Sequence, residues 1–455
     1  MEGKRTIKRA LFGAVVSMFL SGTTWGGEVL TYERACELAR ANSPQIEAQA
    51  YAVEGAQAQL SEAKYYWTPK LSLKSQFGPM PKSSDVTSSE SDIWDNFFDA
   101  WGFTTRNTLE FWMPLFTSTK VYHTHELAKI GYEVEELRAQ NEVLNVEYDV
   151  ARAYIGLQLA MAAQDVLKEA EDYVVQIERE YQKLMESGSE RVKATDQYRI
   201  DIARANLLRL KNTILSKRDY AERALSVHTR LELPIEVESM NFDNVEDELK
   251  GLDDVMALAR AHRGDLKLLD AGERAAAMQA RIEWLNWWPD LVLAGEVSYK
   301  FSNAVPKYEE KNFYIRDGYN GHGFALGFML KWELDRVRQV FKVRQADAKT
   351  ERMRAQRALA ISGIELEVSQ EYQKTSDALA NIGITHASRR SAKRFLTQSL
   401  MDYEAGEGNV NDIISALTTF IEQRSMYLQA LHDYRVALVK LQKTTGVEDT
   451  SRLLK

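Results

Sequence analysis

The chain has 455 residues, enough for two or three ordinary domains. Its 58 basic and 66 acidic residues give a formal net charge of −8, and no basic block occurs beyond the N-terminus, which argues against a nucleic-acid partner. The single cysteine, Cys36, excludes an internal disulfide and a metal site built from several cysteines.

Residues 1–26 have the pattern of a secretory signal peptide. A basic segment is followed by a short apolar run, Ala10 to Leu20, and then by small residues. This run is too short to cross a bilayer as a helix, which takes about 20 residues. A buried N-terminal helix is the alternative interpretation. No later stretch is apolar enough for a transmembrane helix, so any membrane insertion would use β-strands.

Proline positions predict long helices. None of the eight prolines lies between Leu115 and Leu233 or after Pro306, and uninterrupted helices require such exclusion. Apolar residues from Leu127 to Ile155 follow the 3-4 spacing of a coiled-coil seam. The first long helix is predicted to continue to about Glu186, so that about 65 residues form a rod on the order of 100 Å long. A second helix is expected to return over about 191–230.

Four segments alternate between apolar and polar residues, which predicts strands at about 68–78, 103–114, 289–301 and 323–333. The polar stretch Gly78 to Asp99, with two prolines, is predicted to be a long exposed loop. The sequence Pro-Leu-Phe at 114–116 is predicted to end the second strand, and a loop is expected over 302–322.

The chain is predicted to be an internal duplication with an offset of 220 residues. Leu-Ala-Arg-Ala occurs at 38–41 and again at 258–261, and a proline precedes the first strand of each half at Pro69 and Pro289. Each half reads as helix, strand, loop, strand, long helix, turn and helix. The first repeat is assigned to 27–240, the second to 241–447, and a C-terminal tail to 448–455.

A glycine-containing turn interrupts each pair of long helices. Gly406 and Gly408 can supply the positive φ angles of a tight reversal. Asn409 or Asn411 can cap the returning helix, with Asp412 in its first turn. Gly188 marks the corresponding turn of the first half. Because a transmembrane barrel needs at least about 8 strands, four strands per chain predict that several chains share one barrel.

The chain resembles the TolC family of outer-membrane efflux proteins over almost its whole mature length. The resemblance rests on an ordered set of positions in both halves: Tyr403, Gly406, Asn409, Asp412, Ile413, Ile414 and Ala416, then Tyr181, Gly188, Thr195 and Asp196, with Ala-Arg-Ala-Tyr at 151–154 and Pro-Leu-Phe at 114–116. It implies a mainly α-helical fold with a small transmembrane β part. Three chains would then form a 12-stranded barrel and a helical tunnel.

The resemblance also implies a function. The homotrimer would be a passive export channel in the outer membrane of a Gram-negative bacterium, with a long periplasmic part. Its partners would be outer-membrane lipid, a periplasmic membrane-fusion (adaptor) protein and an inner-membrane pump of the RND, ABC or MFS type. The exported cargo and the class of pump stay open.

The resemblance assigns two kinds of site. Asp412 and Asp196 would form the periplasmic gate, although both can also be ordinary first-turn acids that stabilise helix starts. The hairpin tips would dock the adaptor through Gly188, Ser189, Gly406, Glu407, Gly408 and Asn409. Gly408 stands where the family often has a gate-locking arginine, and Ser415 where it has a second acid, so Arg191 or Lys193 can supply the closing bond instead.

Two other classes of protein are weighed against the channel. A soluble periplasmic coiled-coil adaptor or scaffold would explain the helices, but not four alternating segments in duplicated positions. An enzyme is disfavoured because no phosphate-binding glycine loop, nucleophile elbow or Cys/His cluster occurs. We therefore expect no catalytic residue, cofactor or bound metal.

Overall fold

The computed structural model describes residues 29–82, 101–187, 193–240, 247–307, 317–405, 407–447 and 449–454. They belong to two compact units, each assembled from both halves of the sequence. The hairpin unit takes its residues from Met1–Glu47, Glu142–Arg263 and Glu365–Lys455, and the sheet unit from Ala48–Asn141 and Gly264–Ile364. The predicted signal segment, Gly188, Ser189, Arg191 and Gly406 lie outside the described residues.

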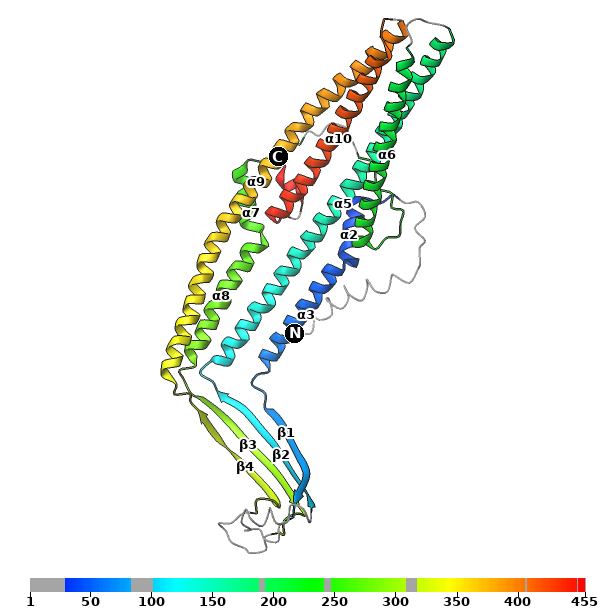
Figure 1. The fold of residues 1–455 in the computed structure, drawn as a ribbon. Helices are drawn as coiled ribbons and strands as arrows, with labels where there is room; N and C mark the ends of the chain where they lie inside the picture. Colours follow the sequence, from blue (N-terminus) through cyan, green and yellow to red (C-terminus); the bar gives the residue numbers. More distant parts are fainter. Residues whose placement is uncertain are drawn as a thin grey trace. The chain divides into compact units, whose positions relative to one another are not determined.

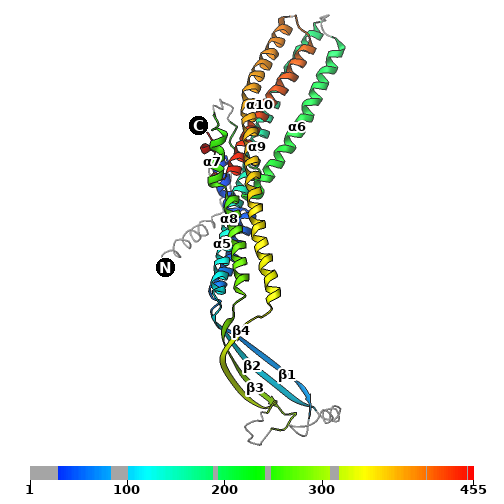
Figure 2. The ribbon, with the colours of Figure 1, turned by 90° about the vertical axis from the view of Figure 1, so that its left-hand side faces the viewer.

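The hairpin unit is entirely helical apart from its connectors. It contains α2 (Tyr32–Asn42), α6 (Ala194–Thr229), α7 (Leu252–His262), α10 (Val410–Thr445), the later parts of α5 (Lys120–Glu186) and α9 (Arg336–Ala405), and a 3-10 turn, η1 (Thr450–Leu453). Two antiparallel pairs, α5 with α6 and α9 with α10, reach the same end of this unit (Figures 1 and 2). The predicted end of α5 at about Glu186 is confirmed.

Caps define where several of these helices begin and end. The Thr31 hydroxyl accepts the Arg34 N–H at 3.3 Å at the start of α2. Gly446 ends α10 with φ +72°, and its N–H returns to the Gln442 carbonyl at 2.9 Å. A Cβ at Gly446 would also lie 3.0 Å from the Arg263 Cα. Glycine is therefore required there both by conformation and by close approach.

The sheet unit combines four strands with the remaining helices. The helices are α3 (Pro44–Lys64) from Ala48 onward, α8 (Gly264–Leu285) and the first parts of α5 and α9; the strands are β1 (Lys70–Pro81), β2 (Trp101–Phe116), β3 (Asp290–Ser302) and β4 (Gly321–Lys331). The strands are antiparallel in the order β1-β2-β3-β4 and form a twisted sheet (Figures 1 and 2). The four predicted strands and their sequential order along the chain are thus present.

One face of the sheet is apolar and exposed. Leu71, Leu73 and Phe77 of β1 are 66 %, 70 % and 75 % exposed, and Phe324 and Phe328 of β4 reach 75 % and 74 %. The alternate positions of β1 carry lysine, serine and glutamine, whereas those of β4 between residues 323 and 329 carry glycine, alanine and methionine. Soluble proteins rarely expose so large a contiguous apolar surface, which marks this face as a contact surface.

The predicted end of the first strand was wrong. The segment expected to begin a loop at Gly78 continues β1 through Pro79 and Pro81, which pair with Phe103 and Trp101. Proline is tolerated there because β1 lies at an edge of the described sheet, where one side of the strand needs no donor. The strand β2 ends at Phe116, within the Pro-Leu-Phe segment predicted to end it, with a register irregularity between Pro114 and Phe116. The helix α5 begins only at Lys120, after Ser118 and Thr119 adopt positive φ.

Candidate functional site

The candidate site is the end of the hairpin unit where both helix pairs turn. One apolar cluster joins the four helices just behind the turns. Its members include Tyr181 of α5, Ile200 of α6, Leu396 of α9, and Ile413 and Phe420 of α10, all less than 8 % exposed. Tyr173 packs edge-on against Phe420, with ring centroids 6.2 Å apart. The cluster therefore fixes the positions of both turns within one rigid packing unit.

The turn between α9 and α10 is held by its own backbone. The Asp402 carbonyl accepts the N–H groups of Glu407 at 2.8 Å and Gly408 at 3.0 Å. A Cβ at Gly408 would lie 3.1 Å from the Tyr403 nitrogen and 3.3 Å from the Asp402 carbonyl carbon. The prediction that Gly408 supplies a positive φ is wrong, because its φ lies outside that region. Glycine is favoured at this position instead because a Cβ would crowd the backbone at the end of α9.

Asn409 is the residue that caps α10. Its side-chain oxygen accepts the Asp412 N–H at 3.1 Å, and its backbone is extended. Of the two candidates from the sequence, Asn411 has no such role and lines a groove described below. The Asp412 side chain is exposed, and within the described ranges no ion pair engages it. Glu407 is exposed as well, so this turn presents acidic groups to its surroundings.

The turn before α6 places its aspartate differently. Asp196 is only 6 % exposed, and its carboxylate accepts the Lys193 N–H at 3.0 Å. The Arg199 guanidinium lies 3.6 Å from the other carboxylate oxygen. Lys193 thus contributes its backbone to this turn, and Asp196 satisfies a free donor at the helix start. The two aspartates predicted as one gate therefore have different surroundings, one buried and bonded and one exposed.

A groove between α6 and α10 adjoins the turns. Its volume is about 450 Å³, and its apolar lining comes from Ile202, Leu207 and Leu210 of α6 and from Ile414, Leu417 and Ile421 of α10. Arg199, Arg209 and Glu422 lie along its borders. Sequence reasoning missed this groove, because it did not predict which helices of the two repeats lie side by side. The repeated apolar spacing in both helices was the available signal.

Charged side chains bind the helices together beside this groove. Arg424 of α10 pairs with Glu169 of α5 and lies 5.7 Å from the Phe420 ring centroid. Burial lowers the pKa of the Arg424 guanidinium. Lys211 of α6 lies 3.1 Å from Glu171, and Arg204 pairs with Glu178. Since most of these groups are half-exposed, each pair is worth at most about 1 kcal/mol.

The described residues hold neither a metal cluster nor an apolar membrane helix. No group of three or more His, Cys, Asp or Glu side chains there is arranged to bind a metal ion. Within the same ranges, no helix has the length and apolar character needed to cross a bilayer.

Comparison with known proteins decides the family. The sequence model of the family described as "Outer membrane efflux protein" matches residues 35–225 and 255–447, one stretch in each half. The chain belongs to this family. Its duplicated halves and four-stranded sheet are therefore those of an outer membrane efflux protein. No curated protein matches the chain by sequence.

Several solved structures share this fold over most of their length. The Campylobacter jejuni CmeC outer membrane channel superposes with a TM-score of 0.69 at 17 % identity, covering 95 % of this chain and 93 % of that one. The outer membrane protein VceC of Vibrio cholerae gives 0.68 at 16 %, covering 91 % and 96 %. The open state of the Neisseria gonorrhoeae MtrE outer membrane channel gives 0.68 at 15 %, covering 91 % and 88 %.

Proposed function

We propose that the chain forms a passive homotrimeric export duct in the outer membrane of a Gram-negative bacterium. The sheet carries this proposal. Its β1 and β4 strands are open edges among the described residues, and one of its faces is apolar and exposed. In lipid, unpaired backbone groups cost several kcal/mol each, so open edges have to be closed by other strands. Three copies of four strands give twelve, above the minimum of about 8 for a closed barrel.

Membership of the outer membrane efflux family supports the same proposal. In the trimer, the apolar face would contact lipid and the polar face would line the pore. The two turns would form the periplasmic end, where Glu407, Gly408 and Asn409, with Gly188, Ser189 and Gly406, dock an adaptor protein. An inner-membrane pump of the RND, ABC or MFS type would supply the energy, and the duct itself needs no catalytic step or cofactor.

Asp412 and Asp196 are proposed to border the periplasmic mouth. Three exposed Asp412 carboxylates around a threefold axis would attract cations and repel anions. The buried Asp196 would hold the start of α6 in place. It would therefore affect the mouth only indirectly, by positioning this helix. The exposure of Asp412 and the hydrogen bond of Asp196 support this division of roles.

Membrane fractionation tests the duct. The full chain should be recovered from outer membranes only with detergent and should migrate as a trimer on an unheated gel. Recovery as a soluble monomer without detergent would favour an adaptor or scaffold and contradict the duct.

Planar-bilayer recording tests the mouth. Asp412→Asn should weaken cation selectivity, whereas Asp433→Asn, an exposed carboxylate farther along the same helix, should leave it unchanged. Equal selectivity of Asp412→Asn and the wild type would remove Asp412 from the gate.

A further inference from the structure

Like charges face each other across the central strand pair of the sheet. Arg106 of β2 lies directly opposite Lys300 of β3, and Glu110 lies directly opposite Glu296. Directly opposed like charges destabilise a sheet, whereas opposite charges stabilise it. Exchanging one residue between the two pairs would turn both into attractive pairs. The stability of the sheet therefore does not account for this arrangement.

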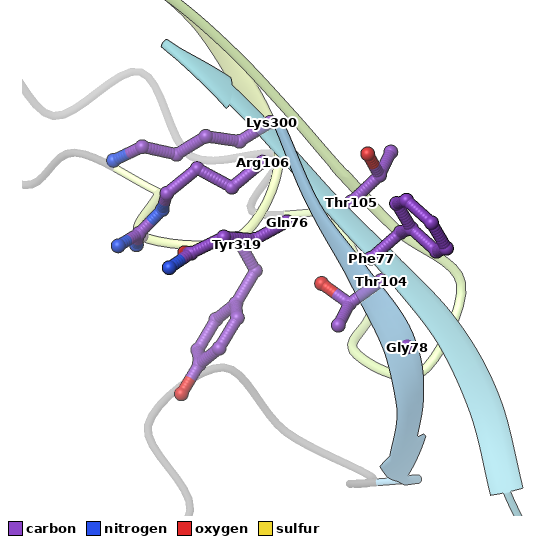
Figure 3. A pocket seen from close by; sticks show the side chains of 9 residues that line it. Gln76, Phe77, Gly78, Thr104, Thr105, Arg106, Lys300 and Tyr319 are labelled. Atoms are coloured by element: carbon purple, nitrogen blue, oxygen red, sulfur yellow. The ribbon is translucent and has the colours of Figure 1, made fainter. Parts of the chain in front are cut away.

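The four charges share the polar face. Positions alternate between the faces of a strand, so Arg106 and Glu110 lie on the side away from Leu109, and Lys300 and Glu296 on the side away from Phe301. Figure 3 shows the side chains of Arg106, Lys300 and Gln76 directed to one side of the strands and Phe77 to the other. The charges are thus placed on the face proposed to line the pore.

The basic pair borders a small pocket of hydrogen-bond donors. The pocket has a volume of about 300 Å³, and Arg106, Lys300, Gln76 and Tyr319 are among the residues that line it. Tyr319 projects to the same side as the two cations (Figure 3). A guanidinium, an ammonium, an amide and a phenol all donate hydrogen bonds. This set of donors suits a carboxylate, phosphate or sulfate group.

The basic and acidic pairs differ in how far they are neutralised. Lys74 of β1 lies 2.5 Å from the Glu110 carboxylate, which compensates that charge. In the part of the chain that the structure describes, no ion pair engages Arg106 or Lys300. The basic pair, Arg106 and Lys300, lies four residues along the strands from the acidic pair, Glu110 and Glu296, which is about 13 Å. This distance exceeds the screening length of roughly 8 Å at physiological salt, so the acidic pair does not cancel the positive potential around the basic pair.

We propose that Arg106 and Lys300 form an anion-binding level at the end of the sheet where β1 leads to β2. The proposal rests on the duct, because each chain contributes two cations and three chains would place six around the pore. Such a level favours solutes that carry carboxylate, phosphate or sulfate groups in the last part of their passage. It favours solutes of the opposite charge from those that the proposed Asp412 mouth favours.

Calorimetry with tripolyphosphate on the detergent-solubilised full chain tests this site directly. The wild type should bind the anion at least about tenfold more tightly than R106Q/K300Q, with an affinity that falls as salt rises. Lys331→Gln removes a cation from the other end of β4 and should bind like the wild type. Segment 83–100 contains five acidic residues and no basic one. If these neutralise the level, the wild type and R106Q/K300Q will bind equally weakly, and the proposal is overturned.

Recording in planar bilayers separates this inference from the duct. Tripolyphosphate on the sheet side should block the wild type at a concentration about tenfold lower than it blocks R106Q/K300Q. E110Q/E296Q should be blocked at least as readily as the wild type, because it keeps both cations. If the wild type conducts but is neither blocked by tripolyphosphate nor binds it, the duct is supported and the anion-binding level is contradicted. A wild type that binds the anion but never conducts supports the anion level and contradicts the duct.

Discussion

Replacing Asp196 by alanine should loosen the first turn of α6. The buried carboxylate accepts the Lys193 N–H at 3.0 Å and lies at the positive end of the helix. Loss of a capping acceptor costs typically about 1 kcal/mol, and of a charged acceptor about 1.5–3 kcal/mol. A local cost of about 1.4 kcal/mol corresponds to tenfold faster amide exchange through local opening. Asp196→Asn keeps an acceptor and loses only the charge, worth about 0.3–1 kcal/mol, so its exchange should rise less than about fivefold.

Hydrogen exchange of the detergent-solubilised full chain, read on peptides covering 193–200, measures this difference. Asp412→Ala is the matched control, because Asp412 occupies the corresponding turn of α10 while Asn409 makes the capping bond. Its effect on peptides covering 409–416 should stay below about threefold. The reasoning would be refuted if Asp196→Asn and Asp196→Ala accelerated exchange equally, or if Asp412→Ala loosened its turn as much as Asp196→Ala.

Two further predictions concern the turn glycine and one tyrosine. Gly408→Ala should lower the stability of the protein to thermal unfolding by roughly 1 kcal/mol, because its Cβ would press on the α9 backbone. Gly383→Ala is the control: Gly383 lies in open space within α9, so an alanine there should raise the stability by up to about 1 kcal/mol. Equal effects would contradict this. Tyr132 donates to Glu136 at 2.5 Å, which raises the pKa of Tyr132 to about 12. The stability from this bond is complete below pH 10 and is lost as pH rises towards 12. Subtracting the absorbance titration of Tyr132→Phe from that of the wild type isolates the titration of Tyr132. Its midpoint should lie near pH 12, and a midpoint near pH 10 would refute the bond.

The helix ends were predictable because local chemistry decides them. Proline exclusion gave the length of α5, and the Gly-Glu-Gly-Asn run gave the start of α10 at Val410. The end of β1 was not predictable, because Pro79 and Pro81 are excluded from a central strand but tolerated at an edge. The sequence alone does not state which strands are edges.

The positions of the two turns along the chain were predictable, but the contacts around them were not. The reason for Gly408 is a close approach to the α9 backbone, which depends on the path of the turn and not on the φ of one residue. The groove between α6 and α10 depends on packing between helices from different repeats. The opposed charges of β2 and β3 depend on register, since a shift of one residue would move each charge to the other face.

The order of the strands also sets an order of folding. The outer pairs are local: Gln76 meets Arg106 after 30 residues, and Lys300 meets Gly321 after 21. The central pair joins Arg106 to Lys300 across 194 residues, so closing it costs about 1.7 kcal/mol more in loop entropy than closing the β1–β2 pair. The β1–β2 and β3–β4 pairs can therefore form before the central pair, while the inner edge and the apolar face of each pair are still uncovered. A newly made chain is therefore open to aggregation through the unpaired edge of β2 until the second half reaches the first, and its apolar face stays exposed even in the four-stranded sheet.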